Sequence, residues 1–176
     1  PTVVNNVETF AAAAHIMRHG SAWFRTTGTD KSAGSKILSV SGDCAKPGIY
    51  EYPFGVTIQQ VLDDCGAQDV QAAQIGGPSG TLIGSNGFNR RLGFEDMSTG
   101  GSFMVFGRER DLMEVIVNFA HFFAHESCGF CTPCRVGTAL LRNGLDKIAG
   151  GRGTQYDQDE MQRIGMLIKR RSHSGL

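Results

Sequence analysis

The hydrophobic positions near the N-terminus recur at the spacing of a helix. An apolar run with intervals of three and four residues extends from Val7 to Met17, which predicts an amphipathic helix. Asn6 precedes the run and Gly20 follows it, and these residue types favour the N-cap and the C-terminal end of a helix. Residues 23–35 are rich in Thr, Gly and Ser, so we expect a connection there.

The middle of the chain changes to a strand pattern. Residues 37–41 and 49–52 are short β-branched or aromatic runs separated by turn residues, which predicts a hairpin. Thr57 is expected to cap a short helix that ends at Gly66. Further strands are expected at residues 72–75, 81–83 and 102–106. Two strands, a helix and more strands in so short a stretch predict a small α+β unit of the β-grasp type.

The last third of the chain is predicted to be helical. Apolar residues from Leu112 to Phe123 fall at intervals of three and four and lead into a group of cysteines. Two further helices are expected at residues 136–148 and 157–170. The predicted fold class is therefore α+β, a β-grasp unit followed by a C-terminal helical bundle that carries a cysteine loop.

Composition and charge exclude several classes of partner. Lys plus Arg and Asp plus Glu each number 17, so the chain has no net charge to attract nucleic acid or an anionic membrane surface. No apolar stretch approaches the roughly 20 residues that a membrane-spanning helix needs, and the N-terminus lacks the pattern of a signal peptide. We expect a cytoplasmic protein without nucleic-acid binding or membrane insertion. Because the chain begins with Pro1, not Met, we also expect a piece of a longer protein.

Three of the five cysteines lie within seven residues, at Cys128, Cys131 and Cys134. This crowding makes a poor disulfide framework and favours metal or redox chemistry. Gly129 and Pro133 interrupt helical continuation, so the thiols are expected on a loop. A C-x-x-C-x-x-C loop can direct three sulfurs at separate irons of a cubane cluster, with a fourth ligand from elsewhere.

Two other interpretations of these cysteines remain. They could form a buried apolar stripe on a helix, which the intervening Gly and Pro disfavour. They could also bind zinc with His125 or His173 as an added ligand, although zinc sites more often pair one C-x-x-C with a remote second pair. Cys44 and Cys65 are expected to be small packed hydrophobic residues. The glycines of residues 76–84 lack the G-x-G-x-x-G order and predict a turn, not a phosphate site.

Three stretches carry a resemblance to a known family. Residues 1–9 read PTVVNNVET, residues 126–137 read ESCGFCTPCRVG, and residues 39–51 read SVSGDCAKPGIYE. Together they resemble the flavoprotein subunit of respiratory complex I and its relative, the diaphorase subunit of NAD-reducing hydrogenases. The third stretch looks closer to the hydrogenase branch. The resemblance covers essentially the whole chain.

The resemblance implies a division into parts. Residues 1–34 would be a remnant of the FMN domain with a linker helix, residues 35–107 a ubiquitin-like β-grasp domain of the SLBB type, and residues 108–176 the iron-sulfur bundle. Asn5 and Asn6 match the family's asparagine pair beside FMN. The upstream glycine-rich loop and acidic residues that bind FMN and NAD(H) are absent, so this chain alone is expected to be inactive.

The resemblance also implies the cluster ligands and the function. Cys128, Cys131 and Cys134 would hold a 4Fe-4S cluster, with Arg135 stabilising its reduced form. Ser174 stands where the family has its fourth cysteine. Because a serine oxygen is a harder ligand than a thiolate, we expect a weaker cluster, a three-iron species or none.

The complete subunit would relay electrons between NAD(H), FMN and partner subunits of a hydrogenase or complex I-type assembly, among them an iron-sulfur electron-transfer subunit. The alternative is a zinc-stapled or metal-free module for subunit docking, without redox activity.

Overall fold

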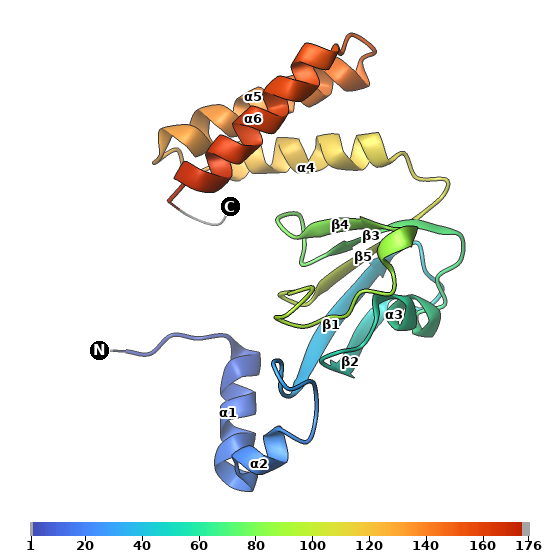
Figure 1. Cartoon of the computed structure of the whole chain (residues 1–176), viewed down its shortest axis with the longest axis vertical. Helices are drawn as coiled ribbons and strands as arrows, with labels where there is room; N and C mark the ends of the chain where they lie inside the picture. Colours follow the sequence, from blue (N-terminus) through green and yellow to red (C-terminus); the bar gives the residue numbers. More distant parts are fainter. Residues whose placement is uncertain (1, 174–176) are drawn as a thin grey trace. The chain divides into compact units, whose positions relative to one another are not determined.

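The computed structural model describes residues 2–173 and contains two compact units, Pro1–Arg108 and Glu109–Leu176 (Figure 1). The first unit contains a mixed sheet and short helices, and the second contains three helices. The elements of the first unit are α1 (Val7–His19), α2 (Ser21–Phe24), β1 (Ser35–Gly42), β2 (Gly48–Pro53), α3 (Ile58–Asp64), β3 (Val70–Ile75), β4 (Thr81–Gly84), a 3-10 turn (Ser85–Gly87) and β5 (Ser102–Gly107). Those of the second are α4 (Leu112–Glu126), α5 (Thr132–Ala149) and α6 (Gln155–Arg171).

The capped N-terminal helix is present as expected. The Asn6 side chain accepts a hydrogen bond from the N–H of Glu8, and Gly20 forms the C-cap with a φ of 88°. The connection expected at residues 23–35 begins within the short helix α2. α1 buries none of its residues. It is tied to the sheet through Glu8, which pairs with Lys36 and accepts the N–H of Ile37 at 2.9 Å.

The sheet has five strands in the order β2-β1-β5-β3-β4. β1 and β2 form the expected antiparallel hairpin, and β3 pairs with β4 in the same sense. The central pair, β1 and β5, is parallel, with Ser39 opposite Ser102. The α+β class is therefore confirmed for this chain.

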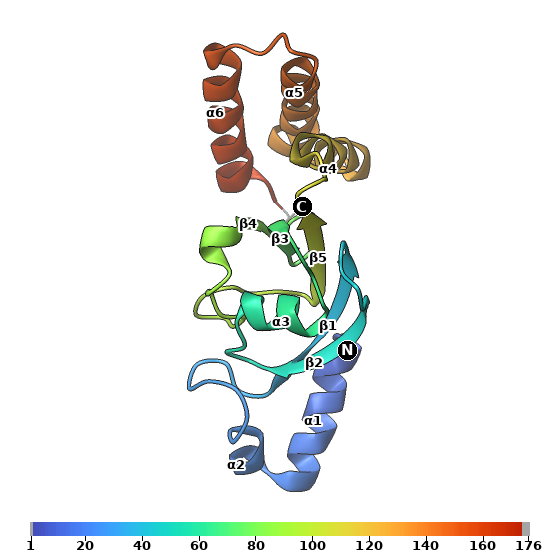
Figure 2. The ribbon, with the colours of Figure 1, turned by 90° about the vertical axis from the view of Figure 1, so that its right-hand side faces the viewer.

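The core of the first unit lies between the sheet and α3, which packs across it (Figures 1 and 2). Thr57 caps α3 by accepting the N–H of Gln60. The segment between β4 and β5 completes this core. It is held to the loop before β1 by Glu95, which accepts the hydroxyl groups of Thr29 and Ser32. The most buried core side chains are Leu38, Ile58, Val61, Leu62, Cys65, Ala73, Ile75, Leu92, Phe103 and Val105.

The three helices of the second unit pack in sequence order, α4 on α5 and α5 on α6. Glycines allow α5 and α6 to approach closely: a Cβ on Gly137 would lie 2.7 Å from side-chain atoms of Ile168, and one on Gly144 would lie 2.8 Å from the sulfur of Met161. A capping box at Thr154 begins α6. Among residues 2–173, no helix is long and apolar enough to cross a membrane.

Asp157 joins the C-terminal end of α5 to the N-terminal end of α6. Asp157 accepts a hydrogen bond from the backbone N–H of Thr154 and pairs with Lys147 at 2.7 Å. The ammonium of Lys147 and the hydroxyl of Thr154 lower the pKa of Asp157 to about 2, against the opposing effect of burial. The carboxylate is therefore charged throughout the neutral range and fixes the turn between the two helices.

Candidate functional site

The cysteine segment begins where α4 ends. Ser127 leaves the helical conformation as the C-cap of α4, and Gly129 follows in the left-handed region with a φ of 74°. This is a conformation that glycine adopts at little cost. Arg135 donates from its guanidinium to the carbonyl oxygen of Gly129 at 2.7 Å. That bond closes the loop against the first turn of α5.

The three cysteines do not all lie on a loop, which corrects the sequence-based expectation. Cys131 is the N-cap of α5 and Cys134 lies in its first turn, while Cys128 precedes the helix. The helix begins at Thr132 and not at Val136, because a proline is tolerated in the first turn, where its missing N–H would have no helical partner. Pro133 therefore opens the helix instead of preventing it.

This placement gives the three thiols different surroundings. Cys128 is exposed, Cys131 is half-buried, and Cys134 is only 4% exposed. The N-terminal end of α5 directs backbone N–H groups and the positive end of the helix dipole at this region, which favours negative charge there. A thiolate or a group with net negative charge is therefore stabilised at this end of the helix.

Cys134 is the most constrained of the three. Its sulfur lies 3.3 Å from the hydroxyl oxygen of Ser127. Its carbonyl oxygen accepts the hydroxyl of Thr138 at 2.8 Å, and Thr138 is itself buried. The first turn of α5 is thus pinned on both sides of the buried thiol.

The described C-terminal residues return to the same cysteine segment. The ring of His173 meets the ring of Phe130 edge to face, with centroids 5.6 Å apart. The backbone N–H of His173, and next that of Cys134, lower the pKa of the Cys131 thiol, with a smaller contribution from the Ser172 side chain. Ser174, which follows in sequence, lies outside the described residues.

Ser172 contributes an unusual feature to this region. Its hydroxyl oxygen is buried, and it has no conventional hydrogen-bond partner among residues 2–173. Buried polar atoms are nearly always paired in folded proteins, and the nearest partner for this hydroxyl is the thiol of Cys131, whose pKa it lowers. Because the Ser172 side chain acts on the Cys131 thiol, it is placed to contact a group that the cysteines bind.

The residues present fit an iron-sulfur cluster by their chemistry. Among residues 2–173, no three His, Cys, Asp or Glu side chains converge as they would around a single metal ion. A cubane binds its cysteines at separate irons, so its ligands are more widely spaced than those of one ion. Two thiols at the N-terminus of α5, the Cys128 thiol just before it and the Ser172 hydroxyl provide sulfur ligands and a donor for such a group.

The asparagines implicated by the resemblance lie in the first unit and the cysteines in the second. Asn5 accepts the N–H of Asn6 at 2.8 Å through its side-chain oxygen, and Asn6 caps α1 in the same way. Both are exposed. Although burial would raise it, the pKa of Glu8 is held below its ordinary value by Lys36 and the Ile37 N–H. This pair anchors the helix that Asn6 begins.

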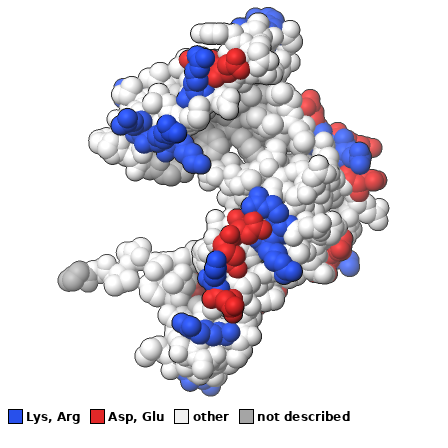
Figure 3. Space-filling model, viewed as in Figure 1, with Lys and Arg blue, Asp and Glu red and all other residues white. Residues whose placement is uncertain are grey.

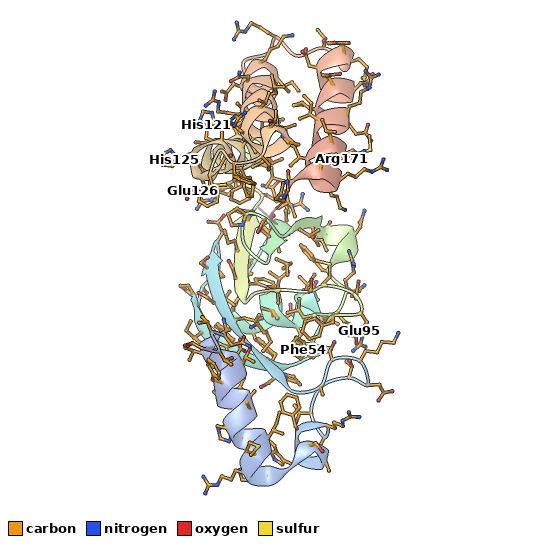
Figure 4. The ribbon with its side chains drawn as sticks, turned by 90° about the vertical axis from the view of Figure 1, so that its left-hand side faces the viewer. Phe54, Glu95, His121, His125, Glu126 and Arg171 are labelled. Carbon is orange, nitrogen blue, oxygen red and sulfur yellow. The ribbon has the colours of Figure 1, made fainter. Side chains whose placement is uncertain are left out.

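The histidines of α4 are separate from these contacts. His121 is exposed and pairs with Asp146 of α5 at 2.8 Å. His125 is exposed on the last turn of α4, and Figure 4 shows both rings on this helix with Glu126, while Arg171 marks the end of α6. His121 therefore links two helices.

Apart from the cysteine region, a concavity lies in the first unit, between α1, α2 and the sheet. It has a volume of about 770 Å³ and is lined mainly by aliphatic and aromatic side chains, among them Ile16, Trp23 and Phe54. Phe54, labelled in Figure 4, contacts Phe94, another lining residue, with ring centroids 5.4 Å apart. Its two acidic residues both have partners: Glu8 pairs with Lys36, and Glu51 accepts the hydroxyl of Ser35 at 2.6 Å. The pocket is thus an apolar groove without an evident catalytic group.

Sequence reasoning missed the roles of two serines beside the cysteines, Ser127 and Ser172. Ser127 sits directly before the first cysteine, where its potential for a helix C-cap was visible but its contact with Cys134 was not. Ser172 reaches the site only because α6 packs along α5. A contact of that kind depends on tertiary structure and has no local signal in the sequence.

Comparisons with known proteins identify what the second unit resembles. Residues 114–176 match the NADH-ubiquinone oxidoreductase-F iron-sulfur binding region. The whole chain is similar to the alpha subunit of the NAD-reducing hydrogenase HoxS of Cupriavidus necator, with 48% identity and 29% of that relative covered. It is also similar over its whole length to the F subunit of the NADH-quinone oxidoreductase of Streptomyces coelicolor, with 36% identity and 41% of that relative covered.

A solved structure agrees with these matches. The crystal structure of an NAD+-reducing nickel–iron hydrogenase in the H2-reduced state matches 99% of this chain with a TM-score of 0.94 and 45% identity, and 31% of that chain is covered. The chain thus spans less than half the length of these relatives. The resemblance inferred from the three sequence stretches is confirmed, and the hydrogenase and complex I-type relatives are subunits of larger assemblies by their names.

Proposed function

From the match of residues 114–176 to the NADH-ubiquinone oxidoreductase-F iron-sulfur binding region, we propose that this chain is the electron-relay portion of an NAD(H)-dependent oxidoreductase subunit. The observation that carries the proposal is the cysteine segment at the start of α5, with Ser172 beside it. The complete subunit exchanges electrons between NAD(H), FMN and partner subunits. This chain supplies the iron-sulfur part and is inactive alone.

Cys128, Cys131 and Cys134 are the proposed ligands of a 4Fe-4S cluster, with Ser174 at the fourth position. When bound, the cluster supplies one-electron transfer. Cys134 holds its ligand position rigidly, because Ser127 and Thr138 fix the turn around it. Ser172 and the N-terminal amides of α5 offer hydrogen-bond donors, which stabilise additional negative charge. Arg135 keeps the loop closed and adds a positive charge nearby.

Residues 35–107 of the first unit are proposed to be a β-grasp domain of the SLBB type. Its support is the strand order β2-β1-β5-β3-β4 with a parallel central pair and α3 packed across the sheet. The proposed domains are residues 1–34, 35–107 and 108–176. Asn5 and Asn6 are proposed to lie beside FMN in the complete subunit, held by the anchored start of α1.

The proposed partners are other subunits of a hydrogenase or complex I-type assembly, including an iron-sulfur subunit that accepts the electrons. The relatives' names support assembly into such complexes. The second unit exposes several large apolar side chains that are available for contacts, among them Phe122, Phe130 and Leu167. Its surface charges are mixed in sign (Figure 3), so nucleic acid is not among the proposed partners. A cytoplasmic location stays a prediction.

The test is to measure iron and acid-labile sulfide per chain in protein purified without oxygen, with EPR after dithionite reduction. Ser174→Cys is the comparison variant. If it binds about four irons with a reduced-cluster signal and the present chain binds fewer, the proposal stands.

If neither version takes up iron, the relay function is wrong. Zinc at one equivalent would instead favour the zinc-stapled docking module. Cys131→Ser separates the two roles further, because a redox role predicts loss of the EPR signal while the helices remain folded by circular dichroism.

A further inference from the structure

Two cysteines outside the proposed cluster site lie side by side in the first unit. Cys44 follows β1 in the turn toward β2, and Cys65 is the C-cap of α3. Two backbone hydrogen bonds join these segments: the N–H of Lys46 donates to the carbonyl of Cys65 at 2.9 Å, and the N–H of Ala45 donates to that of Gly66 at 3.4 Å. The turn and the helix end are therefore held together.

The two thiols are in contact within this arrangement. Cys44 packs against the buried core cluster to which Cys65 belongs. Burial, and next the neighbouring Cys44 sulfur, raise the pKa of Cys65 to about 11, and the two side chains are close enough to share a hydrogen bond. The Cys65 thiol also donates to the carbonyl of Leu62 at 3.3 Å. Both cysteines are free thiols.

The two thiols differ in exposure, and this determines which of them reacts first. Cys65 is fully buried with 0% exposure, whereas Cys44 is half-buried and accessible to a small oxidant. A thiol that is both accessible and next to a second thiol is the usual arrangement of an oxidisable dithiol. Because the segments are already joined by backbone hydrogen bonds, closing a disulfide requires no large movement of the chain.

We propose that Cys44 and Cys65 form an oxidative modification site that closes to a disulfide when the protein meets a hydroperoxide. The Cys44 thiolate attacks one peroxide oxygen, the O–O bond breaks, and Cys44 becomes a sulfenic acid as water or an alcohol leaves. The Cys65 sulfur then attacks the Cys44 sulfur, an S–S bond forms, the S–O bond breaks and water is released. Two electrons pass from the two sulfurs to the peroxide, and both thiol protons end in the released products.

The oxidised form has a defined mechanical effect. The new bond ties the β1–β2 turn to the end of α3, the helix that covers the sheet. Crosslinking restricts the unfolded chain, so the first unit becomes more resistant to unfolding. The reaction is slow at neutral pH because Cys65 holds its proton, and it accelerates in alkaline solution. A reducing thiol returns the pair to its starting state.

The test uses the full chain treated with hydrogen peroxide, alkylated and digested with trypsin. Lys46 is followed by proline and resists cleavage, so residues 37–90 form one peptide that contains Cys44 and Cys65 and none of the cluster cysteines. After peroxide, we expect this peptide to carry neither alkyl adduct and to have lost two hydrogens relative to the dithiol. Cleavage of this oxidised peptide at Glu51 must leave the two halves joined. Dithiothreitol followed by a second alkylation must separate the halves and add one alkyl group to each cysteine.

Cys44→Ser is the matched variant, because its side chain is half-buried and the substitution is isosteric. It must abolish the mass loss while circular dichroism stays unchanged. Three results would overturn the proposal: both thiols of the native chain remain alkylatable after peroxide, Cys44 proceeds to the sulfinic acid without bonding to Cys65, or either cysteine links to one of the cluster cysteines instead. Faster bond formation in alkaline buffer is the additional result expected from the buried state of Cys65.

Discussion

The helices α5 and α6 approach closely at Gly137, and substituting this glycine directly tests how the cysteine segment is positioned. Gly137 lies one turn beyond Cys134, and Ile168, which it faces, lies one turn before Ser172. An added Cβ would lie 2.7 Å from two side-chain atoms of Ile168 and 3.4 Å from Ile164. The distance between the helices at this point therefore sets the distance between Cys134 and Ser172.

The expected magnitude follows from two opposing effects. Replacing a helical glycine by alanine favours the helix by about 1 kcal/mol, while overpacking a close contact costs about 1–3 kcal/mol. Gly137→Ala should therefore lose about 0–2 kcal/mol of unfolding free energy. Gly165→Ala, in α6, is the matched control, because its added Cβ meets nothing within 4 Å. It should gain about 1 kcal/mol, so the two variants differ by about 1–3 kcal/mol.

The assay is thermal unfolding followed by far-ultraviolet circular dichroism, since α4, α5 and α6 contain most of the helical residues. For a unit of this size, each 1 kcal/mol shifts Tm by roughly 4–8 °C. Fluorescence of Trp23, the single tryptophan, reports the first unit and should not change. Iron content after reconstitution should fall in Gly137→Ala and stay unchanged in Gly165→Ala. Equal stabilisation by both substitutions would refute the close helix contact.

Three further outcomes follow from the ion pairs and the Ser172 hydroxyl. Because the pKa of Asp157 is lowered to about 2 from an ordinary value of 3.8, its stabilisation is present above about pH 4 and is lost as the pH falls through 2. Urea unfolding across this range should show the loss in the native chain and not in Asp157→Asn. Ser172→Ala removes a hydrogen-bond donor worth about 0.5–1.5 kcal/mol, so the reduction potential of the reconstituted cluster should fall by roughly 20–60 mV in redox-titrated EPR, with an unchanged value contradicting the donor role. Glu8→Gln weakens the link to Lys36, and amide hydrogen exchange in α1 should become faster while that of β5 stays the same.

The sequence predicted the structure correctly where an element depends on residues that are near one another in the chain. The cap at Asn6, the glycine that ends α1 and the cap at Thr57 were all predicted, because a helix end depends on a few neighbouring residues. The β1–β2 hairpin was predicted for the same reason. The start of α5 was wrong because Pro133 was interpreted as a helix breaker, when its position in the first turn makes it compatible with the helix.

The sequence was insufficient where distant residues meet. The parallel pairing of β1 with β5 and the burial of Phe88, Leu92 and Met97 from the segment after β4 depend on tertiary packing. The same holds for Cys44 and Cys65, which were each expected to be isolated packed residues. The identity of the cluster ligands stays a prediction, because the cysteine pattern indicates the chemistry without fixing the positions of the sulfurs.

The parallel pair at the centre of the sheet affects the order in which the protein folds during synthesis. β1 pairs with β5, which is made more than fifty residues later, and Val40 faces Phe103 in that pairing. The hairpin, α3 and β3 must therefore wait on the ribosome with an incomplete sheet and exposed core residues. The three helices that follow are contiguous and make mostly local contacts, which form quickly. Emergence of β5 from the ribosome is thus the step that allows the first unit to complete its fold. Mutations that weaken this strand should increase the dependence of folding on chaperones.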